Sequence, residues 1–145
     1  MLDAWLLDAQ ALLSLDSTLP RIGFESSATG AIRMSDDLSS KTCTPCRGGV
    51  EPLTRAEAEG YLVQAPGWAL VDEGHRIEGS FKFKNFKEAM DFVAKIGSLS
   101  EKEGHHPDIS FGWGWAKVSW QTKKIKGLHE NDFIMAAKTN ELHGA

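Results

Sequence analysis

Two adjacent histidines followed by a proline, His105-His106-Pro107, are the residues of this 145-residue chain that are best suited to chemistry. Imidazole side chains titrate near neutral pH, so two of them at one corner of a fold can serve as acid and base. Glu101 lies four residues before His105, where a helix would bring the carboxylate close enough to orient that ring. Pro107 biases His106 toward extended backbone and so fixes how the chain leaves the helix. The spacing is compatible with proton transfer or ligand binding.

Two other interpretations of the histidine pair stay open at this point. Histidines in loops are often surface residues without a role in chemistry. A metal site would need further ligands, but neighbouring side chains point in different directions and no third Asp or His follows at a standard spacing. Spacing alone favours neither proton transfer nor a surface role, and it gives less support to a metal.

The two cysteines, Cys43 and Cys46, form a C-x-x-C pair. A structural zinc site needs four ligands, and the sequence has no second pair at the usual spacing. A redox dithiol normally begins a helix that follows a strand, whereas this pair lies in a stretch rich in Ser, Thr, Gly and Pro. We therefore expect inert thiols. Two thiols without a recognisable export signal are typical of the reducing cytoplasm.

The charge pattern argues against a nucleic-acid partner. The chain carries 16 Lys and Arg and 20 Asp and Glu, a net charge of −4, and its basic residues are interleaved with acids. The one dense basic group, formed by Lys123, Lys124 and Lys126, is typical of a solvated loop. No apolar run approaches the ~20 residues that span a bilayer. We expect no membrane segment and no direct contact with nucleic acid.

The first third of the sequence differs from the rest. Apolar residues at helical spacing predict an amphipathic helix over residues 2–15. From residue 16 to residue 49 this periodicity is lost and small polar residues dominate, which indicates an irregular linker. We therefore expect an extension over residues 1–49 and one domain over residues 50–145. Residues 1–33, which precede Met34, should be dispensable for folding.

Local signals predict three helices in the domain. Thr54 with Glu57 forms a capping box that starts a helix reaching to about residue 64. Asn85 caps a longer amphipathic helix, which ends at Gly104. The last helix is expected over residues 130–142.

Alternation of apolar and polar residues predicts four strands, over residues 68–71, 75–84, 108–113 and 115–122. The order of elements is therefore α-β-β-α-β-β-α. We predict an α+β fold in which a four-stranded antiparallel sheet carries three helices on one face, because this arrangement buries one face of each element.

The chemistry-bearing residues also resemble a known signature. The pattern Glu101-x3-His105-His106-Pro107-x5-Trp113-x9-Lys123-x8-Asp132 is similar to that of the pterin-4a-carbinolamine dehydratases. That family carries an acidic or polar residue, His-His-Pro, an aromatic residue, a third histidine and an aspartate. Every spacing fits, and Lys123 is the one residue that departs. The likeness covers about residues 43–143 and extends to Trp68, Phe81, Phe83, Asn85, Phe86, Ala89, Gly127 and Leu128.

The resemblance implies an activity. Family members dehydrate 4a-hydroxytetrahydropterin to quinonoid dihydropterin during the recycling of tetrahydropterin cofactors, using histidines and neither metal nor cofactor. Carried onto this chain, His105 and His106 would contact the pterin and transfer protons, with Lys123 as the third catalytic residue. Glu101, which would also support the histidines, would bind the substrate together with Pro107 and Trp113, and Trp113 would wall the site. The resemblance also implies a homodimer or homotetramer.

Lys123 leaves the activity open. An ordinary lysine is a cation at neutral pH and cannot act as a base. It could donate a hydrogen bond to the 4a-hydroxyl, or it could be a surface residue left after the loss of a catalytic group. Asp132 is better explained as an acid in the first turn of a helix, where the helix dipole favours it. The alternative function is therefore a catalytically weak family member that acts in protein binding, dimerisation or assembly.

Overall fold

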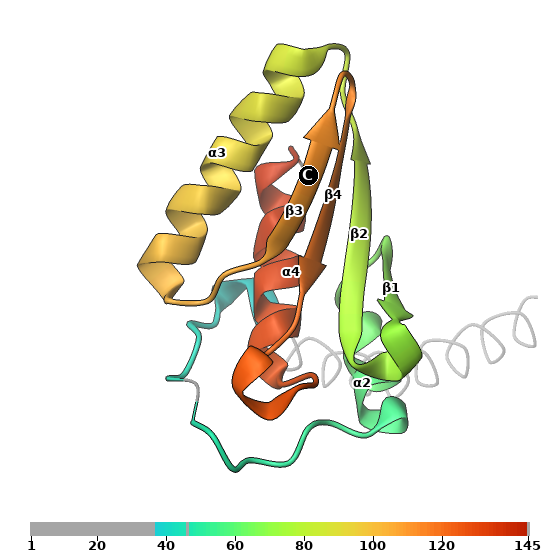
Figure 1. Ribbon diagram of the computed structural model, residues 1–145, viewed down its shortest axis with the longest axis vertical. Helices are drawn as coiled ribbons and strands as arrows, with labels where there is room; N and C mark the ends of the chain where they lie inside the picture. Colours follow the sequence, from blue (N-terminus) through green and yellow to red (C-terminus); the bar gives the residue numbers. More distant parts are fainter. Residues whose placement is uncertain (1–36, 46, 145) are drawn as a thin grey trace, which may run out of the picture. The chain divides into compact units, whose positions relative to one another are not determined.

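A four-stranded antiparallel sheet forms the centre of the fold (Figure 1). The structure, a computed structural model, describes residues 37–45 and 47–144. The predicted helix over residues 2–15 and Cys46 lie outside the described residues. The strands lie in the order β1-β2-β4-β3, with the bounds β1 (Trp68–Val71), β2 (Arg76–Lys82), β3 (Asp108–Gly112) and β4 (Trp115–Trp120).

The strand register confirms the predicted alternation. Ile77 pairs with Trp120, and two residues further along β2 Gly79 pairs with Val118. These four residues lie on the buried face, whereas the side chains of Glu78 and Lys82 point to the other face of the sheet. β1 has the predicted bounds, whereas β2, β3 and β4 end one or two residues earlier than alternation alone predicted. The chain reverses at Trp113 and at Gly114, whose φ is 80°, so β3 stops at Gly112.

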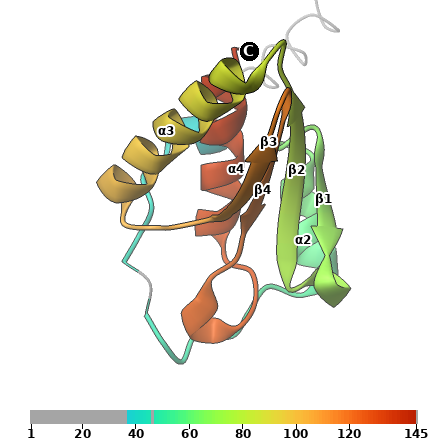
Figure 2. The same ribbon diagram turned by 45° about the horizontal axis from the view of Figure 1, so that its top comes forward.

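Three helices cover the buried face of the sheet (Figure 2), so the predicted α+β fold with its α-β-β-α-β-β-α order is confirmed. Tyr61 stacks on Phe133 with 5.1 Å between ring centroids, which joins the first and last helices. Phe92 meets Phe81 of β2 at 4.8 Å and so joins the long helix to the sheet. The helices are α2 (Arg55–Leu62), α3 (Phe86–Glu103) and α4 (Glu130–Leu142).

Short-range hydrogen bonds start each helix where the sequence predicted it. The Thr54 side chain accepts from the backbone N–H of Glu57, whose own side chain accepts from Thr54, which completes the capping box. Asn85 Oδ1 accepts from the backbone N–H of Glu88 at 2.9 Å. A side chain at such a position contributes about 1 kcal/mol to stability.

The core lies between the sheet and the helices. Its largest fully buried side chains include Trp120, Phe133, Ile77 and Ile96. Burial of each such side chain stabilises the fold by about 1.5–3 kcal/mol. Gly79 is required here, because a Cβ at this position would lie 2.8 Å from the Trp68 ring.

The stretch before α2 packs on this domain although most of it forms neither helix nor strand. Leu38, in the short 3-10 helix η2 (Leu38–Ser40), is fully buried in the core. The backbone N–H of Cys43 donates to Glu103 Oε2 at 3.0 Å. Thr44 exchanges two hydrogen bonds with the side chain of Asn131, at 3.0 Å and 2.8 Å. Thr44 therefore lies beside the start of α4. In the described part of the chain, no helix has the length and apolar character that a bilayer crossing needs.

Candidate functional site

The histidine pair lies where α3 ends and the chain turns toward β3 (Figure 1). Gly104 ends the helix in the left-handed conformation, with a φ of 68°. The backbone N–H of His105 then donates to the carbonyl of Ser100 at 3.2 Å. This hydrogen bond is common at helix ends that contain a left-handed glycine. Pro107 follows and β3 begins at Asp108. The direction of both imidazoles is thus fixed by the way the helix ends.

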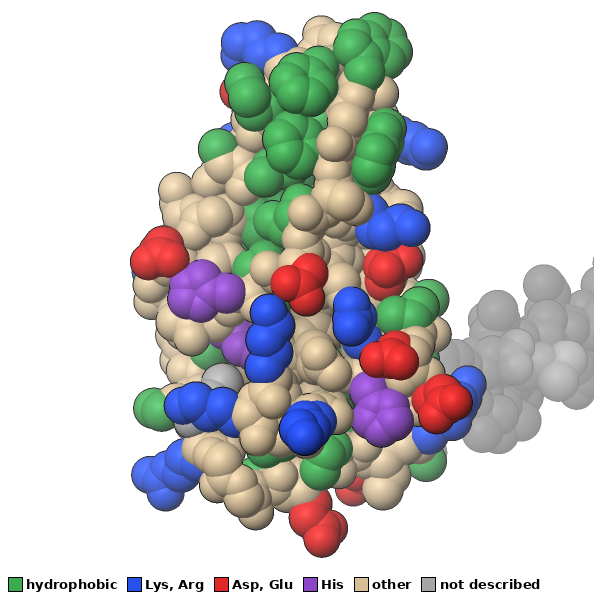
Figure 3. Space-filling model, in the orientation of Figure 1, with side chains coloured by type: hydrophobic (Ala, Val, Ile, Leu, Met, Phe, Trp, Pro, Cys, Tyr) green, Lys and Arg blue, Asp and Glu red, His purple; other side chains and the backbone are tan. Residues whose placement is uncertain are grey.

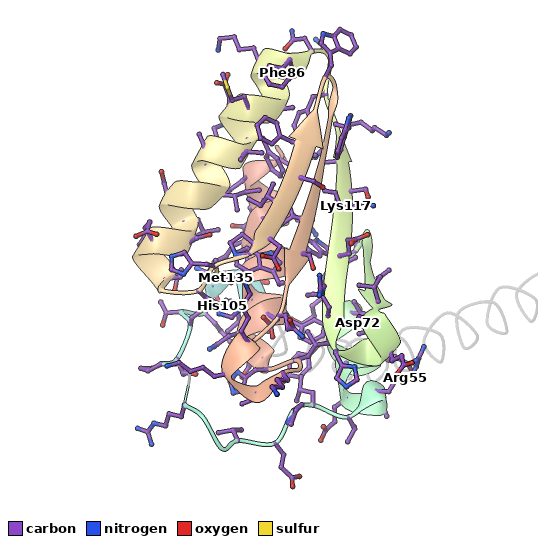
Figure 4. All side chains as sticks on the ribbon, in the orientation of Figure 1. Arg55, Asp72, Phe86, His105, Lys117 and Met135 are labelled. Atoms are coloured by element: carbon purple, nitrogen blue, oxygen red, sulfur yellow. The ribbon has the colours of Figure 1, made fainter. Side chains whose placement is uncertain are left out.

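His105 is buried, with 5% of its surface exposed. Its Nε2 lies 2.6 Å from Oδ1 of Asp132. The imidazole stacks on the indole of Trp120, with ring centroids 5.5 Å apart and planes 12° apart. Figure 4 shows the labelled His105 near the end of α3. A carboxylate and an aromatic face therefore hold this ring in one orientation.

Asp132 is fully buried and receives further hydrogen bonds. Its Oδ2 accepts from Thr122 Oγ1 at 2.8 Å and from the backbone N–H of His129 at 2.9 Å. An ionised carboxylate offers only acceptors, so Nε2 of His105 carries the proton of the shared hydrogen bond. Asp132 is thus the first-turn acid that the sequence indicated and also the residue that sets the tautomer of His105. Sequence reasoning missed this second role.

His106 lies on the surface and bonds a different carboxylate. Its Nε2 is 2.7 Å from Oε1 of Glu101, and both side chains are exposed. Helical spacing suggested that Glu101 would orient His105. It contacts His106 instead, because the left-handed Gly104 turns His105 into the interior and brings the next residue beside the helix.

Lys123 and Trp113 lie at opposite ends of the sheet. Lys123 begins the short 3-10 helix η4 (Lys123–Ile125), and its Nζ is 3.2 Å from Oδ1 of Asp108 in an exposed ion pair. Trp113 lies in the turn between β3 and β4, far from the histidines, with 71% of its surface exposed (Figure 1). Within one chain, the structure brings Lys123 to the histidine pair and leaves Trp113 away from it.

Two neighbouring cavities open beside the histidines. The first, here called the histidine cavity, measures about 360 Å³ and is lined by Pro45, Gly104, His105, His106, Gln121, Thr122, Lys123 and Lys124. The second, here called the arginine cavity, measures about 310 Å³ and is lined by Thr44, Pro45, Arg47, Val50, Thr122, Ile125, His129 and Asn131. Each volume is at the lower end of the range for small-molecule sites. Because Pro45 and Thr122 line both, a ligand in one cavity adjoins the other.

The arrangement suits proton transfer to a small ligand. It combines a buried imidazole of fixed tautomer with an exposed imidazole held by a carboxylate, at the wall of one cavity. Histidine and lysine side chains lie close together over this half of the molecule, whereas hydrophobic side chains gather near the β3–β4 turn (Figure 3). Across residues 37–45 and 47–144, no three His, Cys, Asp or Glu side chains are grouped so as to hold a metal ion.

Comparison with known proteins identifies relatives of this chain. Residues 51–142 match the family model described as pterin 4 alpha carbinolamine dehydratase. A protein of Aromatoleum aromaticum, provisionally named as such a dehydratase, is 68% identical over 109 residues, which cover 75% of this chain and 97% of that protein. A relative from Cupriavidus pinatubonensis with the same provisional name is 65% identical over 109 residues, covering 75% and 94%. The crystal structure of a transcriptional coactivator/pterin dehydratase from Brucella melitensis superimposes with a TM-score of 0.62 at 35% identity, covering 65% of this chain and 100% of that one.

Proposed function

The chain belongs to the pterin-4a-carbinolamine dehydratase family, and we propose that it converts 4a-hydroxytetrahydropterin to quinonoid dihydropterin with loss of water. The observation that carries the proposal is the pair His105 and His106 at one cavity, each bonded to its own carboxylate. The reaction would serve the recycling of a tetrahydropterin cofactor. We place the reaction in the cytoplasm, whose reducing conditions suit a chain with only two cysteines.

The dehydration needs one proton donated to the leaving hydroxyl and one proton removed from the pterin ring. The C4a–O bond breaks and the hydroxyl leaves as water after receiving a proton, while a ring nitrogen loses its proton as the C=N bond forms. In our proposal the two histidines perform these transfers. Asp132 positions His105 through the proton on Nε2, and Glu101 positions His106.

Lys123 would act in this scheme as a hydrogen-bond donor. Its ammonium lines the histidine cavity, and its bond to Asp108 is an exposed ion pair of the kind that contributes about 0–1 kcal/mol. A substrate hydroxyl could therefore replace Asp108 at little cost. The same exposed lysine, where the family pattern has a third histidine, supports the second candidate function, a catalytically weak member that binds or assembles other proteins.

We further propose that the chain forms a homodimer or homotetramer. The strands β1 and β3 form the two edges of the sheet in the described part of the chain, and exposed edges favour pairing with another strand. Large apolar side chains are also exposed around the β3–β4 turn and the start of α3, namely Phe86, Met90, Phe111, Trp113 and Trp115 (Figure 3). Light scattering at micromolar concentration should show an oligomer, and a monomeric mass would contradict this part of the proposal.

The dehydratase activity is tested by following the decay of 4a-hydroxytetrahydropterin in the presence of the full chain. We expect a rate above the spontaneous one that rises in proportion to protein concentration. If the folded protein leaves the spontaneous rate unchanged, the dehydratase proposal fails and protein binding becomes the better explanation of the fold.

A further inference from the structure

The two cavities are lined by cations although the chain as a whole is acidic. Arg47, Lys123 and Lys124 are among the described lining residues, together with three histidines, and none of the described lining residues is Asp or Glu. The net charge of the chain is −4. A concave surface with one sign of charge concentrates ligands of the opposite sign. The cavities therefore favour an anion more than the composition of the protein would suggest.

Arg47 is the cation of the arginine cavity. None of the ion pairs between described residues includes Arg47, whereas Lys123 pairs with Asp108 and Lys41 with Glu130. Thr44 and Asn131, which line the same cavity, are joined by two hydrogen bonds. A guanidinium offers a planar fork of donors that matches the oxygens of phosphate or carboxylate.

His129 adds a second donor to the same cavity. The backbone N–H of Asn131 donates to its Nδ1 at 3.2 Å, so this nitrogen acts as an acceptor. In a neutral imidazole the other nitrogen, Nε2, then carries the proton. Val50 and Ile125 complete the wall with aliphatic surface. The arginine cavity thus combines a guanidinium, an imidazole N–H and an apolar side, which is suited to the end of a short chain bearing an anionic group.

We propose that the arginine cavity receives an anionic substituent, a phosphate or a carboxylate, carried by a pterin whose ring occupies the histidine cavity. The inference rests on the proposed dehydratase function and narrows its substrate to pterins with an acidic side chain. The connection is the shared wall of Pro45 and Thr122, across which a ring in one cavity and its substituent in the other are neighbours.

The test is calorimetric titration of the full chain with neopterin, neopterin 3′-phosphate and folic acid. Neopterin and its phosphate differ only in the charged group, and folic acid offers carboxylates instead. We expect the phosphate to bind about fivefold more tightly than neopterin, the effect of one charged hydrogen bond that remains in contact with water. Arg47→Gln should remove this preference without changing the affinity for neopterin. Arg55→Gln, on an exposed arginine of α2 that lines neither cavity, is the matched control and should keep it.

The outcomes separate the inference from the function on which it rests. A preference for the phosphate alone, for folic acid alone or for both supports an anionic substituent and identifies its source, provided that Arg47→Gln abolishes it. Equal affinity for neopterin and both anionic ligands overturns the inference and leaves the dehydratase function standing. A preference for the anionic ligands that persists in Arg47→Gln also overturns the inference without contradicting the dehydratase function. Failure of the folded protein to bind any of the three pterins contradicts the proposed function and the inference with it.

Discussion

Replacing Asp132 with asparagine should change the tautomer of His105 while leaving the shape of the site intact. Three donors point at this buried carboxylate: Nε2 of His105, Oγ1 of Thr122 and the backbone N–H of His129. Asparagine keeps one acceptor oxygen and presents an NH₂ donor in place of the other. The backbone N–H of His129 cannot become an acceptor, but an imidazole can exchange its tautomer. The new NH₂ group is therefore expected to face His105 and move its proton from Nε2 to Nδ1.

The size of both effects follows from the hydrogen bonds. A bond to a charged group contributes about 1.5–3 kcal/mol and a neutral bond about 1 kcal/mol, so the free energy of unfolding should fall by about 1–2 kcal/mol. A domain stable by about 5–15 kcal/mol remains folded after such a loss. A proton-transfer residue in the wrong tautomer loses most of its contribution, so we expect the dehydration rate to fall by about 10²-fold.

The assay combines the dehydration rate with urea unfolding and with nitrogen NMR of the imidazole, which reports the tautomer directly. Asp91→Asn is the matched control, because Asp91 lies in α3 and its contact is an exposed ion pair with Lys87. A folded Asp132→Asn protein with the wild-type rate, or with His105 still protonated on Nε2, would refute the reasoning. A loss of rate without a change of tautomer would show that Asp132 acts by another route.

Three further predictions concern other parts of the domain. Lys123→His should raise the dehydration rate by about 10²-fold, because an imidazole can both give and accept a proton at neutral pH. Lys117→His in β4, outside both cavities, is the control, and an unchanged rate in folded Lys123→His would favour the protein-binding function. Leu38→Ala should lower the free energy of unfolding, measured by urea titration, by about 2–5 kcal/mol, since Leu38 is fully buried. A loss below about 1 kcal/mol would show that the stretch before α2 is not part of the core. The pKa of Glu103 is lowered by the backbone N–H of Cys43 and by Lys138, so its stabilising effect is complete above the pKa of the unfolded chain and is lost as pH falls through the folded value. The difference in unfolding free energy between the wild type and Glu103→Gln should therefore shrink in acid, with Glu141→Gln as the control for net charge, and a difference that is constant with pH would contradict the assignment.

Local features of this fold were predictable because their causes lie within a few residues. The capping box of Thr54 and Glu57 acts over three positions, and so does the cap that Asn85 provides for α3. Gly104 ends α3 because glycine adopts the left-handed conformation without steric cost. Alternation identified the buried faces of the strands, since successive side chains of a strand point to opposite sides.

The site needed information that the sequence pattern does not carry. His105 and Asp132 are 27 residues apart and meet because the end of α3 and the start of α4 are brought together by packing between the two helices. The partner of Glu101 depends on the backbone conformation of Gly104. This conformation turns His105 into the interior and places His106 beside the helix, where it bonds Glu101. Leu38 is a single apolar residue in a polar stretch, so no periodic signal marks it as core.

Trp113 shows a limit of alternation itself. Its position continues the apolar pattern of β3, but strand pairing stops one residue earlier and the residue becomes part of the turn. The register of the sheet does not fix the position of a turn residue. The exposed indole of Trp113 does not line the histidine cavity of its own chain. The resemblance to the family signature indicated the type of residue at this position and not its distance from the histidines.

The central claim is that His105 and His106 transfer the protons of a dehydration reaction. The most direct measurement is the rate of 4a-hydroxytetrahydropterin dehydration by His105→Ala and His106→Ala, with His75→Ala as the control, because His75 is a surface histidine outside both cavities. We predict that each of the first two substitutions lowers the rate by at least about 10²-fold while the third leaves it unchanged. Wild-type rates in folded His105→Ala and His106→Ala proteins would contradict the account.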